Sequence, residues 1–201
     1  LAKGELFNSN KMAASMLFNT YFGRGLSSIV FQEIRESKSL AYSAFSSYNI
    51  ASESEKPDYT MAYVGTQANK LEQAVKAMME LMSNMPEVED QFNQAKAATL
   101  KKIASQRITK SNIFWSYESL KKRGINNDNR KQIYDEIKAM TMEDLKTFFE
   151  DYIKNENYNV MVIGNKKDID FEAISKLGNV KELEIDYLFN YKAKSIFSMG
   201  N

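Results

Sequence analysis

The chain has 201 residues, enough for one domain of ordinary to generous size, and its 27 Lys and Arg against 26 Asp and Glu leave a net charge of +1. Because it has neither a basic excess nor an apolar run of roughly 18 residues, we expect it to bind neither nucleic acid nor a membrane. It contains no His and no Cys, which excludes a conventional zinc site, a Ser-His-Asp triad and thiol catalysis within the chain and leaves Lys, Tyr and carboxylate chemistry.

Two helices are predicted at the start of the chain. Apolar residues recur at helical spacing over residues 12–23, and Gly23-Arg24-Gly25 is expected to end this helix, because glycine adopts backbone angles that other residues avoid. A second helix is predicted to begin at Ser27 or Ser28, with Arg35 near its end. A Gly-x-Gly pair also occurs in phosphate-binding loops, but a dinucleotide fingerprint follows a strand. We therefore interpret this pair as a tight turn between two helices.

The hydrophobic period then changes to two. Alternation over residues 40–48 and a run rich in Tyr, Thr and Val over residues 59–67 predict two strands of a hairpin with a long connection. Helical spacing returns at Asn69-Lys-Leu-Glu72, which has the form of a capping box. The helices predicted after this point lie around residues 71–85, 92–103, 113–123, 133–140 and 141–152, the last of them starting at Thr141-Met-Glu-Asp144.

Strand patterns reappear near the C-terminus. Residues 158–164 contain the buried-type run Val160-Met-Val-Ile163, residues 171–177 form a short helix, and residues 180–185 form a last strand before an aromatic tail. Strands near both ends with helices between them indicate an α+β two-layer domain, a mostly antiparallel sheet packed by several helices. Because so few strands make a thin sheet, we expect the first strand or strands to precede Leu1 and to be missing here.

The segment Phe31-Gln-Glu-Ile-Arg35-Glu-Ser-Lys-Ser-Leu-Ala-Tyr42 joins the second helix to the first strand. A helix that ends with Arg35, a short polar turn and a strand that presents Tyr42 would direct a guanidinium and a phenol toward one space. Judged by residue type alone, a simpler interpretation is favoured: Arg35 in a surface pair with a carboxylate and Tyr42 as a half-buried strand residue.

A resemblance to a known family changes this balance. Leu17-Phe-Asn-Thr-Tyr-Phe-Gly23, followed by Ser27-Ser-Ile-Val-Phe-Gln-Glu-Ile-Arg35-Glu-Ser-Lys-Ser-Leu-Ala-Tyr-Ser43, closely resembles the C-terminal, non-zinc half of the insulinase-like (pitrilysin) family of zinc metallopeptidases. The similarity extends to Thr66-Gln67, to residues 101–110 and to the predicted strand that ends at Gly164. It covers most of the chain.

The resemblance implies a division of labour between two parts of a longer protein. Family members carry zinc on an H-x-x-E-H helix in an N-terminal domain, and the C-terminal half closes over it to form a chamber. Residues 1–201 would then be a single peptidase C-terminal domain, a fragment of a multi-domain protein with no metal or cofactor of its own. The family also implies that Arg35 binds substrate backbone carbonyls and that Tyr42 donates to the carbonyl oxygen as it becomes an oxyanion.

We therefore expect the substrate-binding, chamber-forming domain of a zinc-dependent endopeptidase, a hydrolase inactive when isolated. Its expected partners are a peptide substrate and the N-terminal zinc-bearing domain or subunit. The alternative is a structural or partner subunit of a processing-peptidase-like complex, with no catalytic activity. The missing strand is expected to leave an exposed sheet edge through which copies of the chain associate.

Overall fold

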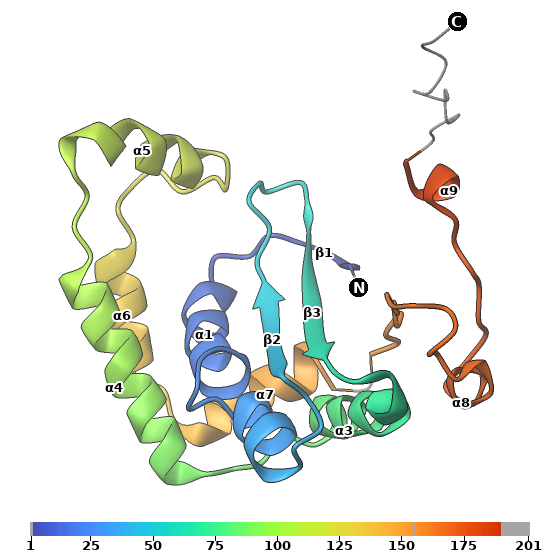
Figure 1. Cartoon of the computed structure of the whole chain (residues 1–201). Helices are drawn as coiled ribbons and strands as arrows, with labels where there is room; N and C mark the ends of the chain where they lie inside the picture. The colour runs from blue at the N-terminus through green and yellow to red at the C-terminus, as the bar shows by residue number, and fades with distance from the viewer. Residues whose placement is uncertain (1, 155, 190–201) are drawn as a thin grey trace, which may run out of the picture.

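In the computed structural model the described residues, 2–154 and 156–189, form one small sheet and a series of helices (Figure 1). The strands are β1 (Ala2–Leu6), β2 (Ser43–Asn49) and β3 (Pro57–Gly65). The longer helices are α1 (Lys11–Phe18), α3 (Leu71–Ser83), α4 (Glu89–Ser105), α5 (Ile113–Lys121), α6 (Arg130–Ala139) and α7 (Met142–Tyr152). The short helical elements are η1 (Asn19–Gly23), α2 (Ile29–Phe31), η2 (Gln32–Ser37), η3 (Ala68–Lys70), η4 (Lys110–Asn112), α8 (Phe171–Ser175) and α9 (Ile185–Phe189).

The sheet is antiparallel, with strand order β1-β3-β2. β1 pairs with β3 in an irregular register, Ala2 opposite Tyr59 and Leu6 opposite Pro57. The expectation that the chain would lack the strand before its first helix is therefore wrong. Ala2–Leu6 contains a glycine, two charged residues and no aromatic or β-branched residue, so its sequence has no strand signal, and pairing with β3 makes it a strand.

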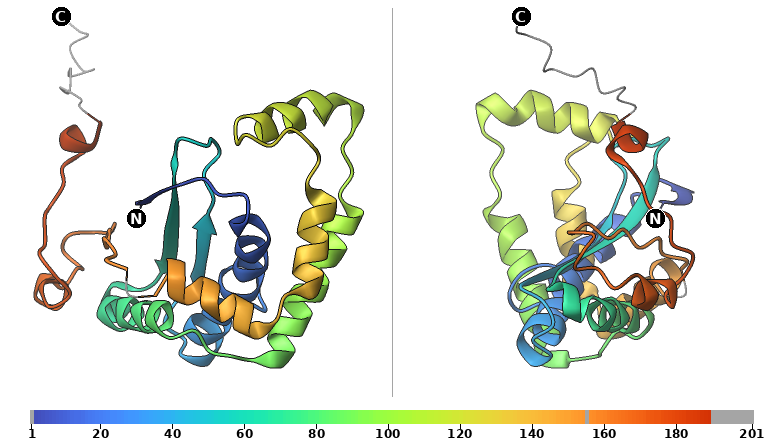
Figure 2. Two further views of the ribbon diagram at one scale, coloured as in Figure 1. Left: turned by 180° about the vertical axis from the view of Figure 1, so that it is seen from behind. Right: turned by 45° about the vertical axis from the view of Figure 1, so that its right-hand side comes forward.

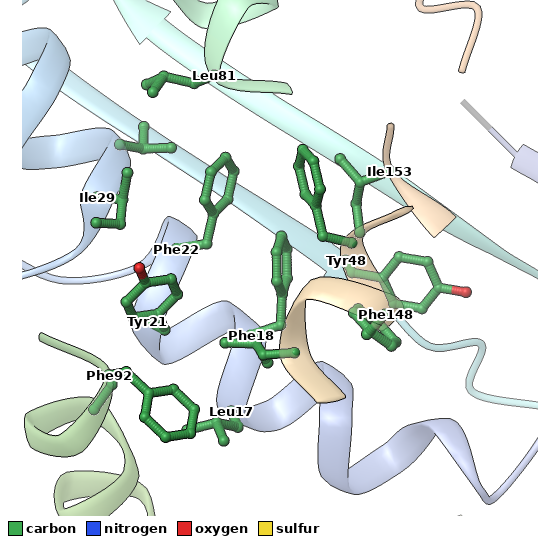
Figure 3. Packing of buried hydrophobic residues seen from close by; sticks show 14 of the residues in the cluster. Leu17, Phe18, Tyr21, Phe22, Ile29, Tyr48, Leu81, Phe92, Phe148 and Ile153 are labelled. Carbon is green, nitrogen blue, oxygen red and sulfur yellow. The ribbon is translucent and has the colours of Figure 1, made fainter. Parts of the chain in front are cut away.

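The helices form a second layer against one face of the hairpin. α1, η1 and α2 contact β2, α3 contacts β3, and α4, α6 and α7 pack around α1. Ala44, Ser46 and Tyr48 of β2 point into this layer and are buried. Figure 3 shows the aromatic centre of the core, where the ring centroids of Phe18 and Phe22 lie 5.0 Å apart. The predicted α+β two-layer fold is confirmed.

Gly23, the last residue of η1, packs against the backbone of β2. A Cβ on Gly23 would lie 2.0 Å from the carbonyl oxygen of Ser46 in β2, so η1 packs directly on the strand backbone. Gly25, two residues later, has φ +94°, a conformation that L side chains rarely adopt. The interpretation of the Gly-x-Gly pair as a turn between helices is confirmed, and the close contact with β2 is an additional constraint.

The predicted strands near the C-terminus are absent from the described residues. Residues 158–164 and 180–185 have no strand pairing, and Ile163 is 91% exposed. Apolar composition alone does not make a strand, because a strand needs a hydrogen-bonding neighbour, and the sheet supplies none for these segments. The predicted tail after residue 189 lies outside the described residues.

The helix starts predicted at Asn69 and Thr141 have different outcomes. Thr141 accepts from the N–H of Asp144, whose carboxylate accepts from the N–H of Thr141, so the start at Thr141 is confirmed and forms a capping box. At the other site η3 precedes α3, and the Glu72 carboxylate pairs with Lys76 at 2.6 Å. None of the described helices is long and apolar enough to cross a membrane.

Candidate functional site

The helical segment that carries Arg35 begins at Ser28, one of the two starts that the sequence predicts. The Ser28 hydroxyl is buried, accepts from the N–H of Phe31 at 3.4 Å and donates to the carbonyl of Gly25 at 2.8 Å. α2 then continues into η2, whose Ile34 is fully buried. This anchor fixes the turn on which the next residue, Arg35, is presented.

The Arg35 side chain lies against an aromatic ring at the surface. Its guanidinium carbon is 4.8 Å from the centroid of Phe31, and its Nε is 3.8 Å from the Glu36 carboxylate. The side chain is 40% exposed, so the ion pair with Glu36 is weak. Within the described residues the guanidinium makes no hydrogen bond, so its fork of donors remains available to a ligand.

Three hydrogen bonds hold the turn between η2 and β2. The N–H of Leu40 donates to the carbonyl of Ile34 at 3.0 Å, and the Thr66 hydroxyl donates to the carbonyl of Leu40 at 2.6 Å. The Lys70 ammonium donates to the carbonyl of Ser39 at 2.9 Å, and Ser39 has φ +48°. The Thr66-Gln67 part of the family resemblance thus includes a residue that fixes this turn.

Tyr42 is anchored by its backbone and projects its ring into solvent. Its N–H donates to the carbonyl of Gly65 at 2.7 Å, one residue before the first paired position of β2, Ser43 opposite Gly65. The residue is 87% exposed, and its hydroxyl has no hydrogen-bond partner in the described part of the chain. The half-buried strand tyrosine of the simpler interpretation is therefore not observed.

Arg35 and Tyr42 lie on either side of one braced turn, and both are accessible. The structure records no hydrogen bond between the two side chains, so they do not satisfy each other. A guanidinium fork and a phenol in this arrangement can donate hydrogen bonds to carbonyl oxygens of an extended peptide. Their roles remain a prediction.

A second surface near this turn was not singled out from the sequence. Phe45, Tyr59, Met61 and Tyr63 lie on the face of the hairpin opposite the helices, and we call them the aromatic face. The rings of Phe45 and Tyr63 stack with centroids 5.3 Å apart. The alternation Tyr-x-Met-x-Tyr in β3 is the signal that identifies it, since apolar residues at period two can lie on the exposed face as well as the buried one.

A buried charged cluster lies on the core side of the same hairpin. The ammonium of Lys11 is 2.6 Å from the Asp58 carboxylate, which also accepts from the Tyr48 hydroxyl at 2.9 Å and from the N–H of Ala51 at 2.8 Å. The carboxylate is fully enclosed and hydrogen-bonded. This cluster is a buried part of the fold and presents no charged group at the surface.

The donor set of this chain does not fit zinc. The sequence has no His and no Cys, and no group of three or more potential metal-ligating side chains occurs in the part that the structure describes. Zinc sites in proteins use imidazole and thiolate ligands above all.

Comparison with known proteins identifies the fold. Residues 4–102 match the family model of the peptidase M16 inactive domain. One similar solved structure is a peptidase M16 inactive domain from Pseudomonas fluorescens, with 15% sequence identity and a TM-score of 0.57 over 74% of this chain and 36% of that one. A conserved protein from Enterococcus faecalis V583 has 18% identity and a TM-score of 0.60 over 74% of this chain and 35% of that one. A protease from Helicobacter pylori has 15% identity and a TM-score of 0.56 over 75% of this chain and 36% of that one.

These matches show a shared fold, and the chain spans only 35% to 36% of the length of the three structures. A search of curated protein sequences finds no significant match.

Proposed function

The chain belongs to the M16 peptidase family as its inactive, C-terminal domain, and on that premise we propose that it binds substrate and closes the chamber of a zinc-dependent endopeptidase. We propose further that residues 1–201 are one domain of a longer protein, whose zinc lies in an N-terminal domain. Two observations support this division: the donor set here does not fit zinc, and the chain spans about a third of the solved relatives.

The position of Tyr42 carries the proposal. The residue is 87% exposed, and its phenol has no partner in the described chain and lies beside a turn braced by three hydrogen bonds, so its hydroxyl is available to a ligand at a fixed position. We propose that its hydroxyl donates to the scissile carbonyl oxygen of a bound peptide as negative charge develops there. Such a donor is worth roughly 3 to 4 kcal/mol in a transition state.

Arg35 is proposed to position the same peptide. Its stacking on Phe31 restricts the guanidinium without consuming its N–H groups. Backbone carbonyls next to the scissile bond are suitable acceptors, because the planar fork matches oxygen atoms spaced along an extended chain. Arg35 thus holds the substrate while Tyr42 contacts the reacting carbonyl.

The aromatic face is proposed to meet the zinc-bearing domain. Tyr59, Met61 and Tyr63 remain about half exposed, on the face of the sheet opposite the one that packs against the helices. Apolar side chains concentrated on one exposed face mark interaction surfaces. Association between copies through the free edge of β1 is a separate proposal, supported by the edge position of that strand in the order β1-β3-β2.

Peptide hydrolysis by separated halves tests the proposed function. The isolated chain should cleave no peptide with or without added zinc, and adding the separately expressed zinc-bearing domain should restore cleavage. Robust turnover by the chain alone would refute its assignment as a non-catalytic half. A mixture that forms a complex yet stays inactive with all peptides would favour the structural or partner subunit instead.

A further inference from the structure

The near-neutral net charge of the chain conceals a strong separation of charge. Residues 101–123, which we call the basic lobe, contain seven basic residues and one acidic residue, whereas the rest of the chain contains 20 basic and 25 acidic residues. The seven are Lys101, Lys102, Arg107, Lys110, Lys121, Lys122 and Arg123. This lobe comprises the end of α4, η4 and α5, together with the residues that follow α5.

The basic lobe also exposes large apolar side chains. α5 has no buried residue, and Trp115, in edge contact with Phe114 at 5.1 Å, is 69% exposed. Figure 1 shows α5 across the far ends of α4 and α6, and among the described elements it packs extensively only against η4. An isolated helix of nine residues is marginal in water, so this apolar surface is suited to a partner.

The helix is fixed at one end and leaves a groove beside it. The carbonyl of Lys122 accepts from the N–H of Ser54 at 3.0 Å, and the Arg123 Nε donates to the carbonyl of Ala51 at 3.1 Å. The groove has a volume of about 510 Å³ and is lined by Ser52, Glu53, Phe114, Trp115, Glu118, Ser119 and Lys122. With two carboxylates, one ammonium and two aromatic rings, this lining suits a polypeptide that carries apolar groups and charges of both signs better than a uniformly anionic surface, such as a lipid membrane or nucleic acid.

The same chain carries a segment of that chemistry. Residues 168–189, the acidic segment, contain six acidic and two basic residues. Its exposed apolar side chains are Phe171, Val180, Leu183, Ile185, Tyr187, Leu188 and Phe189. Figure 1 and the left view of Figure 2 show α8 and α9 on the side of the molecule opposite α5, so the acidic segment does not reach the lobe of its own chain.

We propose that the basic lobe binds the acidic segment of a second copy of this chain, in a head-to-tail contact. The two surfaces are complementary in charge and both expose large apolar side chains, and α5 packs extensively only against η4 among the described elements. Because the contact joins two different surfaces, its repetition produces a ring or an open chain of copies. The proposal is independent of the peptidase assignment.

Charge-swap variants of the full chain test the contact in analytical ultracentrifugation. The unmodified chain should associate at about 50 mM salt, with an apparent dissociation constant about tenfold weaker at about 500 mM. Lys121→Glu/Lys122→Glu and Glu184→Lys/Asp186→Lys should each be monomeric. Mixing the two variants should restore association, because each supplies the surface that the other needs. Lys138→Glu, outside both surfaces, is the matched control and should associate like the unmodified chain.

Several results would overturn the proposal. The proposal is wrong if the unmodified chain is monomeric at low salt, or if either double variant associates like the unmodified chain. It is also wrong if the mixture of the two variants stays monomeric while circular dichroism shows that both are folded. Association that resists both salt and charge reversal would point to the β1 edge instead. Binding of a monomeric chain to phosphatidylserine vesicles would replace the second copy with a lipid surface.

Discussion

The side-chain amide of Asn19 forms two hydrogen bonds with the backbone of Tyr48, each 2.8 Å long. Its Nδ2 donates to the Tyr48 carbonyl, and its Oδ1 accepts from the Tyr48 N–H. The amide thus takes the place of a neighbouring strand along the outer edge of β2. The pairing fixes β2, and with it the backbone that continues to Tyr42, against the first helix.

Removing this amide should destabilise the fold. Asn19→Ala leaves one donor and one acceptor of β2 without partners, so the free energy of unfolding should fall by about 2 kcal/mol. Urea unfolding measures the change. Asn93→Ala, which removes an exposed amide 3.5 Å from Glu89, is the control and should change stability by less than about 0.5 kcal/mol. Equal effects at both positions would contradict a special role for the Asn19 pair.

The two glycines after this helix should respond differently to alanine. Gly23→Ala places a Cβ 2.0 Å from the Ser46 carbonyl oxygen, so the backbone must move and the loss should reach about 3 kcal/mol or more. Gly25→Ala meets no atom within 4 Å and is strained only by its φ of +94°, which costs about 1 kcal/mol. Thermal unfolding distinguishes the two. A larger loss at Gly25 would contradict the packing of η1 on β2.

Breaking the buried ion pair should be more costly than removing both charges. Lys11→Met leaves the enclosed Asp58 carboxylate uncompensated, and about 3 to 5 kcal/mol of stability should be lost. The double variant Lys11→Met/Asp58→Asn should recover part of that loss, because it removes the stranded charge. Chemical denaturation of both variants gives their free energies of unfolding and shows which variant is more stable. A double variant less stable than Lys11→Met would contradict it.

The capping box at α7 should make stability depend on pH. Hydrogen bonds from the backbone and side chain of Thr141 lower the pKa of the Asp144 carboxyl. Because this pKa is lower in the folded state, the ionised carboxyl stabilises the fold at pH values above the unfolded-state pKa of about 3.9. This stabilisation is lost as the pH falls through the folded-state pKa. Asp144→Asn should therefore be less stable than the unmodified chain at neutral pH, and the difference should vanish in acid. A difference that persists unchanged at low pH would rule out this origin.

Much of the helical layer follows from the sequence, since caps and apolar spacing are local signals. Ser28 and Thr141 begin helices where the pattern predicts, because a side-chain oxygen at that position satisfies a free backbone N–H. Asn69 fails as a cap because a 3₁₀ turn occupies that position. The run Val160–Ile163 was predicted as a strand from composition, but pairing depends on a neighbour that a local pattern does not reveal.

In the candidate site, too, the sequence reveals local features but not contacts between distant segments. The sequence places Arg35 near a helix end and Tyr42 at a strand start, and the family resemblance implies the roles proposed for them. It does not reveal that Thr66 and Lys70, from a distant segment, brace the turn between them. Nor does it show whether Tyr42 is buried or exposed, because that depends on what packs over the start of β2.

Arg35 should affect substrate binding more than the chemical step. In the parent enzyme, Arg35→Ala should raise KM for a peptide and lower kcat/KM by roughly tenfold or more, since a hydrogen bond from a charged group is worth about 1.5 to 3 kcal/mol. Arg35→Lys, which keeps the charge but lacks the fork, should recover only part of the loss. Steady-state kinetics measure both. Unchanged KM and kcat/KM in Arg35→Ala would contradict the positioning role.

Peptide hydrolysis by the Tyr42→Phe variant of the proposed parent peptidase tests whether this domain completes the active site. We expect kcat to fall by about 10²- to 10³-fold with unchanged zinc content, because only the donor to the developing oxyanion is lost. Tyr117→Phe, which removes an exposed hydroxyl on α5, should retain normal kinetics. Normal turnover by Tyr42→Phe would contradict the claim that this domain completes the active site.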